Sequence, residues 1–264
     1  MSGSCRRHIM LEQMTGLFIS WFANPCAVGI GLAVAFGAVW LAAYWPPLYK
    51  DAWLWAVLAA SAFLTLAAVA FVQLPLQAWT GQALNHFWDQ EVLVRWLLVA
   101  GIPQVLLSGL VQEGAKLLPV ILYWWRKTWF LMDPKLGLAV GAVAGAGFGI
   151  LEAQWAHNTI FASGWAWGLV ESEGLLALAG FWERFFVVGF HIAASALAGY
   201  GLAKGRGSLF YLLASLLHAL INYGAILVQS SHFSTLQLEL FVATVAVLAT
   251  VVVLWLRWSK PAYA

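Results

Sequence analysis

The sequence predicts an all-α, polytopic membrane protein. Of its 264 residues, 63% are hydrophobic and only 9% are charged, whereas an ordinary soluble domain carries about 25% charged residues. Several apolar runs reach roughly 20 residues, which is enough to cross a ~30 Å hydrocarbon core. A transmembrane barrel would need short alternating segments, and long runs such as 136–149 do not alternate. Helices are therefore expected, with the lipid bilayer as their surroundings.

About seven transmembrane helices are expected, within a single transmembrane domain over residues 1–264. Tryptophans gather at the ends of the apolar runs, as they do at membrane interfaces. The approximate limits of the spans are 16–45, 52–75, 93–125, 136–160, 181–203, 208–229 and 236–258. Residues 9–24, before Pro25, can form a separate interfacial helix. Residues 161–180 are too glycine-rich and acidic for a span, so a loop, an interfacial helix or a lid is expected there.

Basic residues orient the later spans. They flank two short loops and the chain end: Arg126, Lys127 and Lys135; Lys204 and Arg206; Arg257 and Lys260. The 161–180 segment has two glutamates and no Lys or Arg. Because cytoplasmic loops are rich in Lys and Arg, the 126–135 loop, the 204–207 loop and the C-terminus are expected inside. Seven spans then place the N-terminus outside, against Arg6 and Arg7; an eighth span, from splitting 9–45 or 93–125, removes the conflict.

Four ionisable residues lie near the middle of four different apolar spans: Glu113, Glu152, His191 and His218. A charge at the centre of a membrane helix costs at least a few kcal/mol, so such residues usually face protein and usually act in function. Each lies 12 to 17 residues from its nearest basic loop, which is roughly 18–26 Å along a helix. The four side chains are therefore expected at one depth, where they can form one site.

The neighbours of the two glutamates support a protein-facing position. Glu113 and Lys116 are one helical turn apart and can pair, although such a pair can also serve only to hold helices together. Pro119 removes a helix hydrogen bond and predicts a kink nearby. On the next span, glycines recur every fourth residue from 137 to 149, a spacing that lets another helix approach closely. Glu152 lies almost on that stripe.

The two histidines also have polar neighbours on their own helix faces. Arg184 is seven residues before His191, and Ser195 is four residues after it. His218 and Asn222 are four residues apart and share a face. Taken singly, each of these patterns is also compatible with an interhelical hydrogen bond that only supports the structure.

Two carboxylates and two imidazoles at one depth suit two related mechanisms of hydrolysis. In one, a glutamate beside a histidine activates water as a general base, and a His/Asn pair stabilises the oxyanion. In the other, the histidines and a carboxylate bind zinc, which lowers the pKa of bound water, and the remaining glutamate moves protons. The net charge of +2 gives no reason to expect a nucleic acid partner.

The order of these motifs resembles the PrsW and YhfC group of intramembrane peptidases, within the wider CAAX-protease and bacteriocin-processing superfamily. The matching stretches are QEGAK (112–116), GAGFGILEA (145–153), ERFFVVGFHIAASALAGYG (183–201) and LLHALINYG (216–224). They place the catalytic core at about 93–229. The resemblance implies an integral membrane protein of a bacterial or archaeal plasma membrane that cleaves a membrane-embedded or membrane-anchored peptide or protein.

The resemblance further implies an active centre of Glu113, Glu152, His191 and His218, assisted by Asn222. Its PrsW-like motifs favour a metallopeptidase, with Glu152, His191 and His218 as the expected ligands of a metal such as zinc. The family's first motif normally has two adjacent glutamates, and the first is Gln112 here. That departure keeps a non-catalytic scaffold or chaperone as an alternative. A proton-coupled transporter is a further alternative, because buried Glu and His also form proton relays.

Overall fold

The computed structural model describes residues 3–127 and 133–259, and within these residues it consists of helices and short connections. In chain order the helical segments are α1 (Gly3–Ser20), α2 (Ala27–Ala42), α3 (Trp53–Ala68), the π-helical turn η1 (Val69–Gln73), α4 (Leu74–Phe87), α5 (Gln90–Arg95), α6 (Leu97–Ala100), α7 (Ile102–Lys127), α8 (Pro134–Ala162), α9 (Trp167–Glu173), the 3-10 turn η2 (Gly174–Leu178), α10 (Ala179–Ala203), α11 (Gly207–Gln229) and α12 (Thr235–Trp258). The all-α prediction is confirmed for these residues. Residues 128–132 of the predicted cytoplasmic loop, and Lys260, lie outside them.

Six segments of the described chain are long and apolar enough to cross a membrane: 53–87, 97–126, 134–162, 167–203, 207–229 and 235–258. Each overlaps one of the predicted spans. The remaining predicted span, 16–45, is interrupted, because α1 ends at Ser20 and the chain turns through Asn24, with a φ of 47°, and Pro25. Helix α2 that follows has only 16 residues. Seven or eight spans are therefore not confirmed, whereas a separate helix before Pro25 is present as α1.

Helix α8 lies at the centre of the bundle, and most of its residues are buried. The Asp133 carboxylate caps its N-terminus by accepting a hydrogen bond from the Lys135 backbone N–H at 3.1 Å, and Pro134 fits the first helical position. The predicted close approach of another helix to the glycine stripe is present, and that helix is α10. A Cβ added at Gly145 would lie only 2.2 Å from the backbone oxygen of His191. Glycine thus allows the close backbone approach that sets the position of His191 relative to α8.

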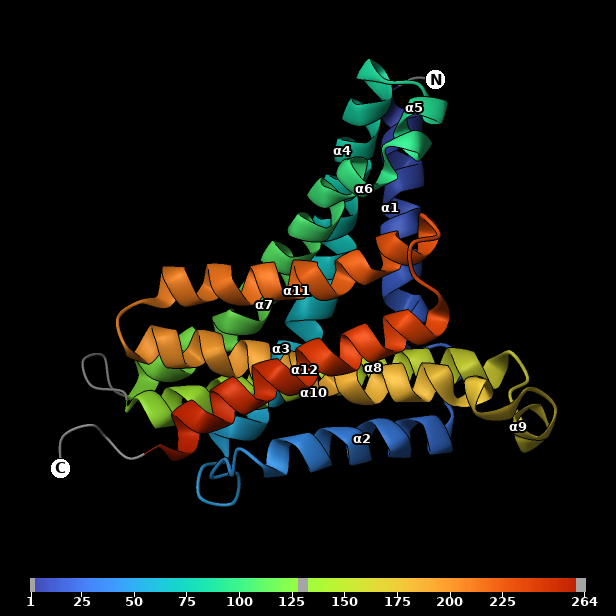
Figure 1. Cartoon of the computed structure of the whole chain (residues 1–264). Helices are drawn as coiled ribbons and strands as arrows, with labels where there is room; N and C mark the ends of the chain where they lie inside the picture. The colour runs from blue at the N-terminus through green and yellow to red at the C-terminus, as the bar shows by residue number, and fades with distance from the viewer. Residues whose placement is uncertain (1–2, 128–132, 260–264) are drawn as a thin grey trace.

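Figure 1 shows α8, α10, α11 and α12 side by side, with α1 and α4 rising from them at a steep angle. The basic ends of the helices gather at one end of this bundle. There the Lys135 Nζ donates to the Ser259 carbonyl at 2.8 Å, and the Arg257 Nε donates to the Tyr44 carbonyl at 3.0 Å. The turn between α10 and α11 lies at the same end (Figure 1). The described parts of the basic segments therefore lie at one end of the bundle.

Candidate active site

Glu113 on α7 is the most deeply buried acid of the site, with 1% of its surface exposed. Its Oε1 accepts hydrogen bonds from the Lys116 Nζ at 2.5 Å and from the His218 Nδ1 at 2.7 Å. The Ser195 hydroxyl lies 3.4 Å from its Oε2. The predicted pairing of Glu113 with Lys116 is therefore present. It connects α7 to the histidine of α11 and the serine of α10.

His191 on α10 lies between a cation and an anion. Its Nδ1 is 3.0 Å from the Lys116 Nζ, and its Nε2 is 2.8 Å from the Glu152 Oε2. A lysine ammonium donates hydrogen bonds and cannot accept them, so the Nδ1 accepts and the Nε2–H donates to Glu152. Both ring nitrogens of His191 are therefore engaged, and the tautomer is set by the two neighbours.

His218 has a different arrangement. Because an ionised carboxylate only accepts hydrogen bonds, the Nδ1 of His218 carries the proton that is donated to Glu113. In the neutral ring this leaves the Nε2 unprotonated. His218 also lines the cavity described below, so it offers a basic nitrogen that can hold a metal ion or orient a water molecule.

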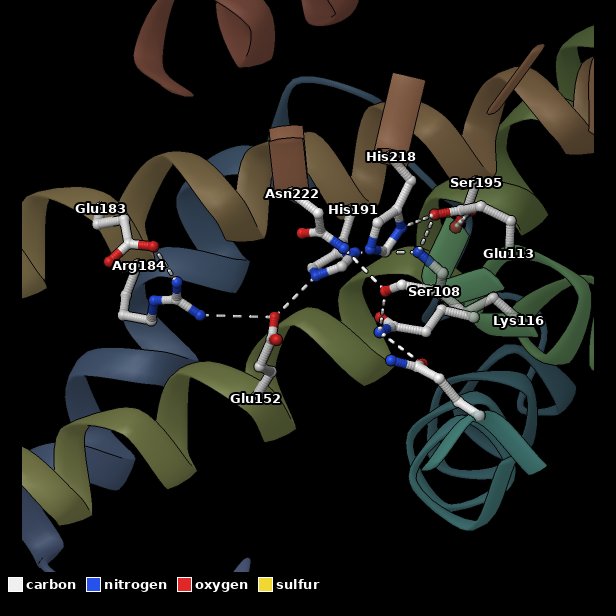
Figure 2. A network of polar contacts seen from close by, with 12 residues as sticks. Ser108, Glu113, Lys116, Glu152, Glu183, Arg184, His191, Ser195, His218 and Asn222 are labelled. Carbon is white, nitrogen blue, oxygen red and sulfur yellow. Dashed lines mark hydrogen bonds and ion pairs between the residues drawn. The ribbon is translucent and has the colours of Figure 1, made fainter. Parts of the chain in front are cut away.

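Glu152 on α8 occupies the more exposed part of the site. Its side chain is 21% exposed, compared with 0% for Glu113. The Arg184 Nη1 lies 3.7 Å from its Oε2, and Arg184 also donates a hydrogen bond to Glu183. Figure 2 shows Arg184 and Glu183 on one side of Glu152 and His191 on the other. The guanidinium therefore compensates the charge of Glu152 and restricts its orientation.

A cavity of about 320 Å³ lies beside these ionisable groups. Glu152, His191, His218 and Asn222 line it, whereas Glu113 and Lys116 lie behind the histidines and do not. Gln73, Leu238 and Val242 also line it, and they lie outside the predicted core of 93–229. The structure therefore brings the five predicted residues to one place but divides them between the cavity wall and the layer behind it.

Asn222 does not contact the histidines through any hydrogen bond within the described chain. Its Nδ2 instead donates to the Ser108 hydroxyl at 2.8 Å. Gln112 also faces this side, where its Nε2 donates to Ser108 and to Gln73, both at 3.1 Å. Sequence reasoning missed Ser108 and Gln73. The only available signal was that each is a polar residue in an apolar run, and residues of this kind are usually directed toward protein.

The donor atoms of Glu113, His191 and His218 lie close enough together to hold a metal ion. One ligand atom from each lies within 4.8 Å of the others, and all three residues are buried. Two imidazoles and a carboxylate form a known ligand set for catalytic zinc. The metal-ligand set expected from the sequence contained Glu152 instead of Glu113. In the structure Glu152 is hydrogen-bonded to the Nε2 of His191, on the side of the ring away from Lys116. Lys116 holds Glu113 Oε1 and His191 Nδ1, so a metal ion here competes with its ammonium group.

The fold and the site define a class of protein: a helical integral membrane protein with a buried glutamate–histidine centre beside a cavity. The family model for the PrsW family intramembrane metalloproteases matches residues 50–256, which is most of the chain. The chain belongs to this family, and membership supports a protease that works within the membrane. Comparison with curated proteins and with solved structures gives no match.

Proposed function

We propose that this protein is an intramembrane endopeptidase that hydrolyses a peptide bond of a membrane-embedded or membrane-anchored protein. The observation that carries the proposal is the convergence of Glu113, His191 and His218, within 4.8 Å of one another, from three helices. Glu152 is hydrogen-bonded to this group and faces the cavity. The cavity of about 320 Å³ beside this centre has room for water and for a short part of a substrate.

The proposed roles follow from burial and hydrogen bonding. Glu113, His191 and His218 would hold the metal, for which zinc is the candidate, and bound zinc supplies a water molecule of lowered pKa and polarises a carbonyl. Glu152 takes the proton of the attacking water and passes it to the leaving amine nitrogen, because it lines the cavity and is hydrogen-bonded to His191. His191 orients Glu152 through its Nε2–H. Asn222 stabilises the oxyanion with the second hydrogen of its amide, since the first is donated to Ser108.

Gln112 stands where the family's motif has the first of two glutamates, and this substitution bears on activity. Neighbouring residues of an α-helix point about 100° apart, so positions 112 and 113 face different surroundings. Glu113 contacts Lys116 and His218, whereas Gln112 contacts Ser108 and Gln73. The centre therefore keeps its acid at position 113, and this supports an active enzyme over a scaffold.

The wider assignment follows from the same motifs. We place the chain in the YhfC-like group and the CAAX-protease superfamily, as a single transmembrane domain with its catalytic core at about 93–229. The basic ends of the bundle support a cytoplasmic C-terminus, because positive residues favour the inner side. A bacterial or archaeal plasma membrane is the proposed location.

The test is cleavage by the full chain in proteoliposomes that contain a pool of single-span peptides, with the fragments identified by mass spectrometry. We expect Glu113→Gln, Glu152→Gln and His218→Ala each to reduce cleavage by at least about 100-fold, as losses of acid–base or electrostatic groups do. The matched controls are Glu171→Gln and His232→Ala, which remove the same groups from exposed positions.

Cleavage that survives Glu113→Gln or His218→Ala refutes the proposed centre. A protein that binds peptides but never cleaves them favours the scaffold alternative. Proton-dependent uptake of a solute without peptide hydrolysis favours the transporter alternative.

A further inference from the structure

One wall of the cavity consists of uncharged hydrogen-bonding groups. Gln73, Ser108, Gln112 and Asn222 lie there, and the first three are at least nine-tenths buried, with exposures of 8%, 4% and 7%. Hydrogen bonds of 2.8–3.1 Å connect the four residues through the Ser108 hydroxyl and the Gln112 amide. Figure 2 shows Ser108 on the side of His191 away from Arg184, with Asn222 next to His191. This wall, called the amide wall below, is separate from the charged groups around Glu152.

A local distortion of the helix directs Gln73 toward the amide wall. Gln73 is the last residue of η1, the π-helical turn between α3 and α4. Ser61, which bonds to the α8 backbone, is 12 residues earlier (73 − 61), so a regular α-helix would place the two roughly 120° apart. A π turn is wider and rotates less per residue. It therefore returns Gln73 toward the protein-facing side of the helix.

The amide wall has hydrogen-bonding capacity that the described residues do not use. The Gln112 Oε1 is buried and has no hydrogen-bond partner among them. A buried acceptor without a partner costs about 1–3 kcal/mol, which a purely structural cluster would normally avoid. The Ser108 oxygen already accepts from both Gln112 and Asn222, so its own proton remains to be donated.

We infer that the amide wall is a subsite that binds the backbone of an extended substrate segment next to the scissile bond. This inference rests on the proposed peptidase function and adds the substrate class. Carboxamides both donate and accept hydrogen bonds, so they match the alternating N–H and C=O groups of an unwound peptide. In a membrane such groups must find a partner within the protein. The Gln112 Oε1 accepts a substrate N–H, and Ser108 donates to a substrate carbonyl.

Part of the cavity lining is apolar, in addition to the charged side chains and histidines that also line it, and this apolar part restricts the substrate side chains. Ile221, Ala225, Leu238 and Val242 line it beside the amide wall, and the wall itself carries no charge. A charged substrate side chain placed there would be desolvated without a partner, which is costly. The subsite therefore selects a membrane segment that unwinds readily and has apolar or small uncharged residues at the cleavage site.

The test measures binding without cleavage. The full chain carrying Glu113→Gln is placed in proteoliposomes with a fluorescein-labelled Leu/Ala peptide of about 25 residues that has a central Gly-Ser-Gly segment. We expect Gln73→Leu and Gln112→Leu each to weaken peptide binding by about three- to tenfold, the value of one or two net hydrogen bonds. Replacing one central amide of the peptide with an ester removes one N–H donor. We expect this change to weaken binding to the parent chain, which carries Glu113→Gln alone, but not to the chain that also carries Gln112→Leu.

The matched control is Gln104→Leu. The Gln104 Nε2 on α7 donates to the Gln77 carbonyl of α4 at 3.1 Å, so its side chain joins α7 to the helical segment that carries Gln73, but it does not line the cavity. Equal weakening by Gln104→Leu assigns the effect to helix packing and overturns the subsite. The subsite is also overturned if the parent chain, which carries Glu113→Gln alone, shows no saturable binding of the peptide.

The outcomes separate the subsite from the proposed activity. If the active chain cleaves the peptide but Gln73→Leu and Gln112→Leu bind it as tightly as the parent, the subsite is wrong and the peptidase stands. If both variants weaken binding while no form of the chain cleaves any peptide, the subsite stands and the peptidase is wrong.

Discussion

Replacing Gly145 with alanine tests whether close packing of α8 against α10 sets the geometry of the site. The new Cβ would lie 2.2 Å from the His191 carbonyl oxygen, and real Cβ atoms essentially never lie closer than 3.0 Å to such a neighbour. The two backbones must therefore separate by at least about 0.8 Å (3.0 − 2.2) at this point. Forced separation of a packed core typically costs about 1–3 kcal/mol.

The same shift affects the hydrogen bond between His191 on α10 and Glu152 on α8. That bond is 2.8 Å long, and a shift along it would lengthen it to about 3.6 Å, where it is no longer a hydrogen bond. Displacement of catalytic groups by about 1 Å can cost roughly 100-fold in rate. We therefore expect Gly145→Ala to lower both thermal stability in detergent and the rate of peptide cleavage.

The matched control is Gly31→Ala on α2. Gly31 is exposed, and a Cβ there meets nothing within 4 Å, so alanine is expected to preserve or slightly raise stability through its better helix propensity. If Gly145→Ala unfolds at the same temperature as Gly31→Ala and cleaves peptide at the parental rate, the reasoning from helix approach to site geometry is refuted.

Three further predictions concern charge, metal and capping. In metal-free protein, Lys116→Met removes the ammonium that pairs with the buried Glu113 carboxylate, so we expect a loss of about 3–5 kcal/mol, read as a lower unfolding temperature in detergent with a chelator present; an unchanged temperature contradicts the ion pair. Metal analysis of purified protein should find stoichiometric zinc that His191→Ala loses and Glu152→Gln keeps; loss from both variants alike would return Glu152 to the ligand set. Ser234→Ala removes the capping box of α12 and should cost about 1 kcal/mol, with cleavage unaffected; equal unfolding temperatures would show that the cap is not needed.

Much of the fold could be predicted because membrane solvation acts on each segment separately. A long apolar run must be helical in lipid, whatever surrounds it, so six of the predicted spans correspond to helices in the structure. The 16–45 span was not confirmed as one continuous helix, because hydropathy averages over Pro25 and does not register the turn at Asn24. The second span was predicted too short, since polar residues near Gln77 lower hydropathy but remain helical through contacts with α7.

The sequence by itself determined which ionisable groups gather in the site. Burying a charge in lipid is costly wherever it occurs, so Glu113, His191 and His218 could be recognised from their own apolar surroundings. The tertiary structure decided how the groups pair. It set Glu113 rather than Glu152 beside His218, and it added Gln73 from a π turn. These choices depend on differences of a few ångströms and on helix rotation between segments far apart in the chain, which hydropathy and spacing do not encode.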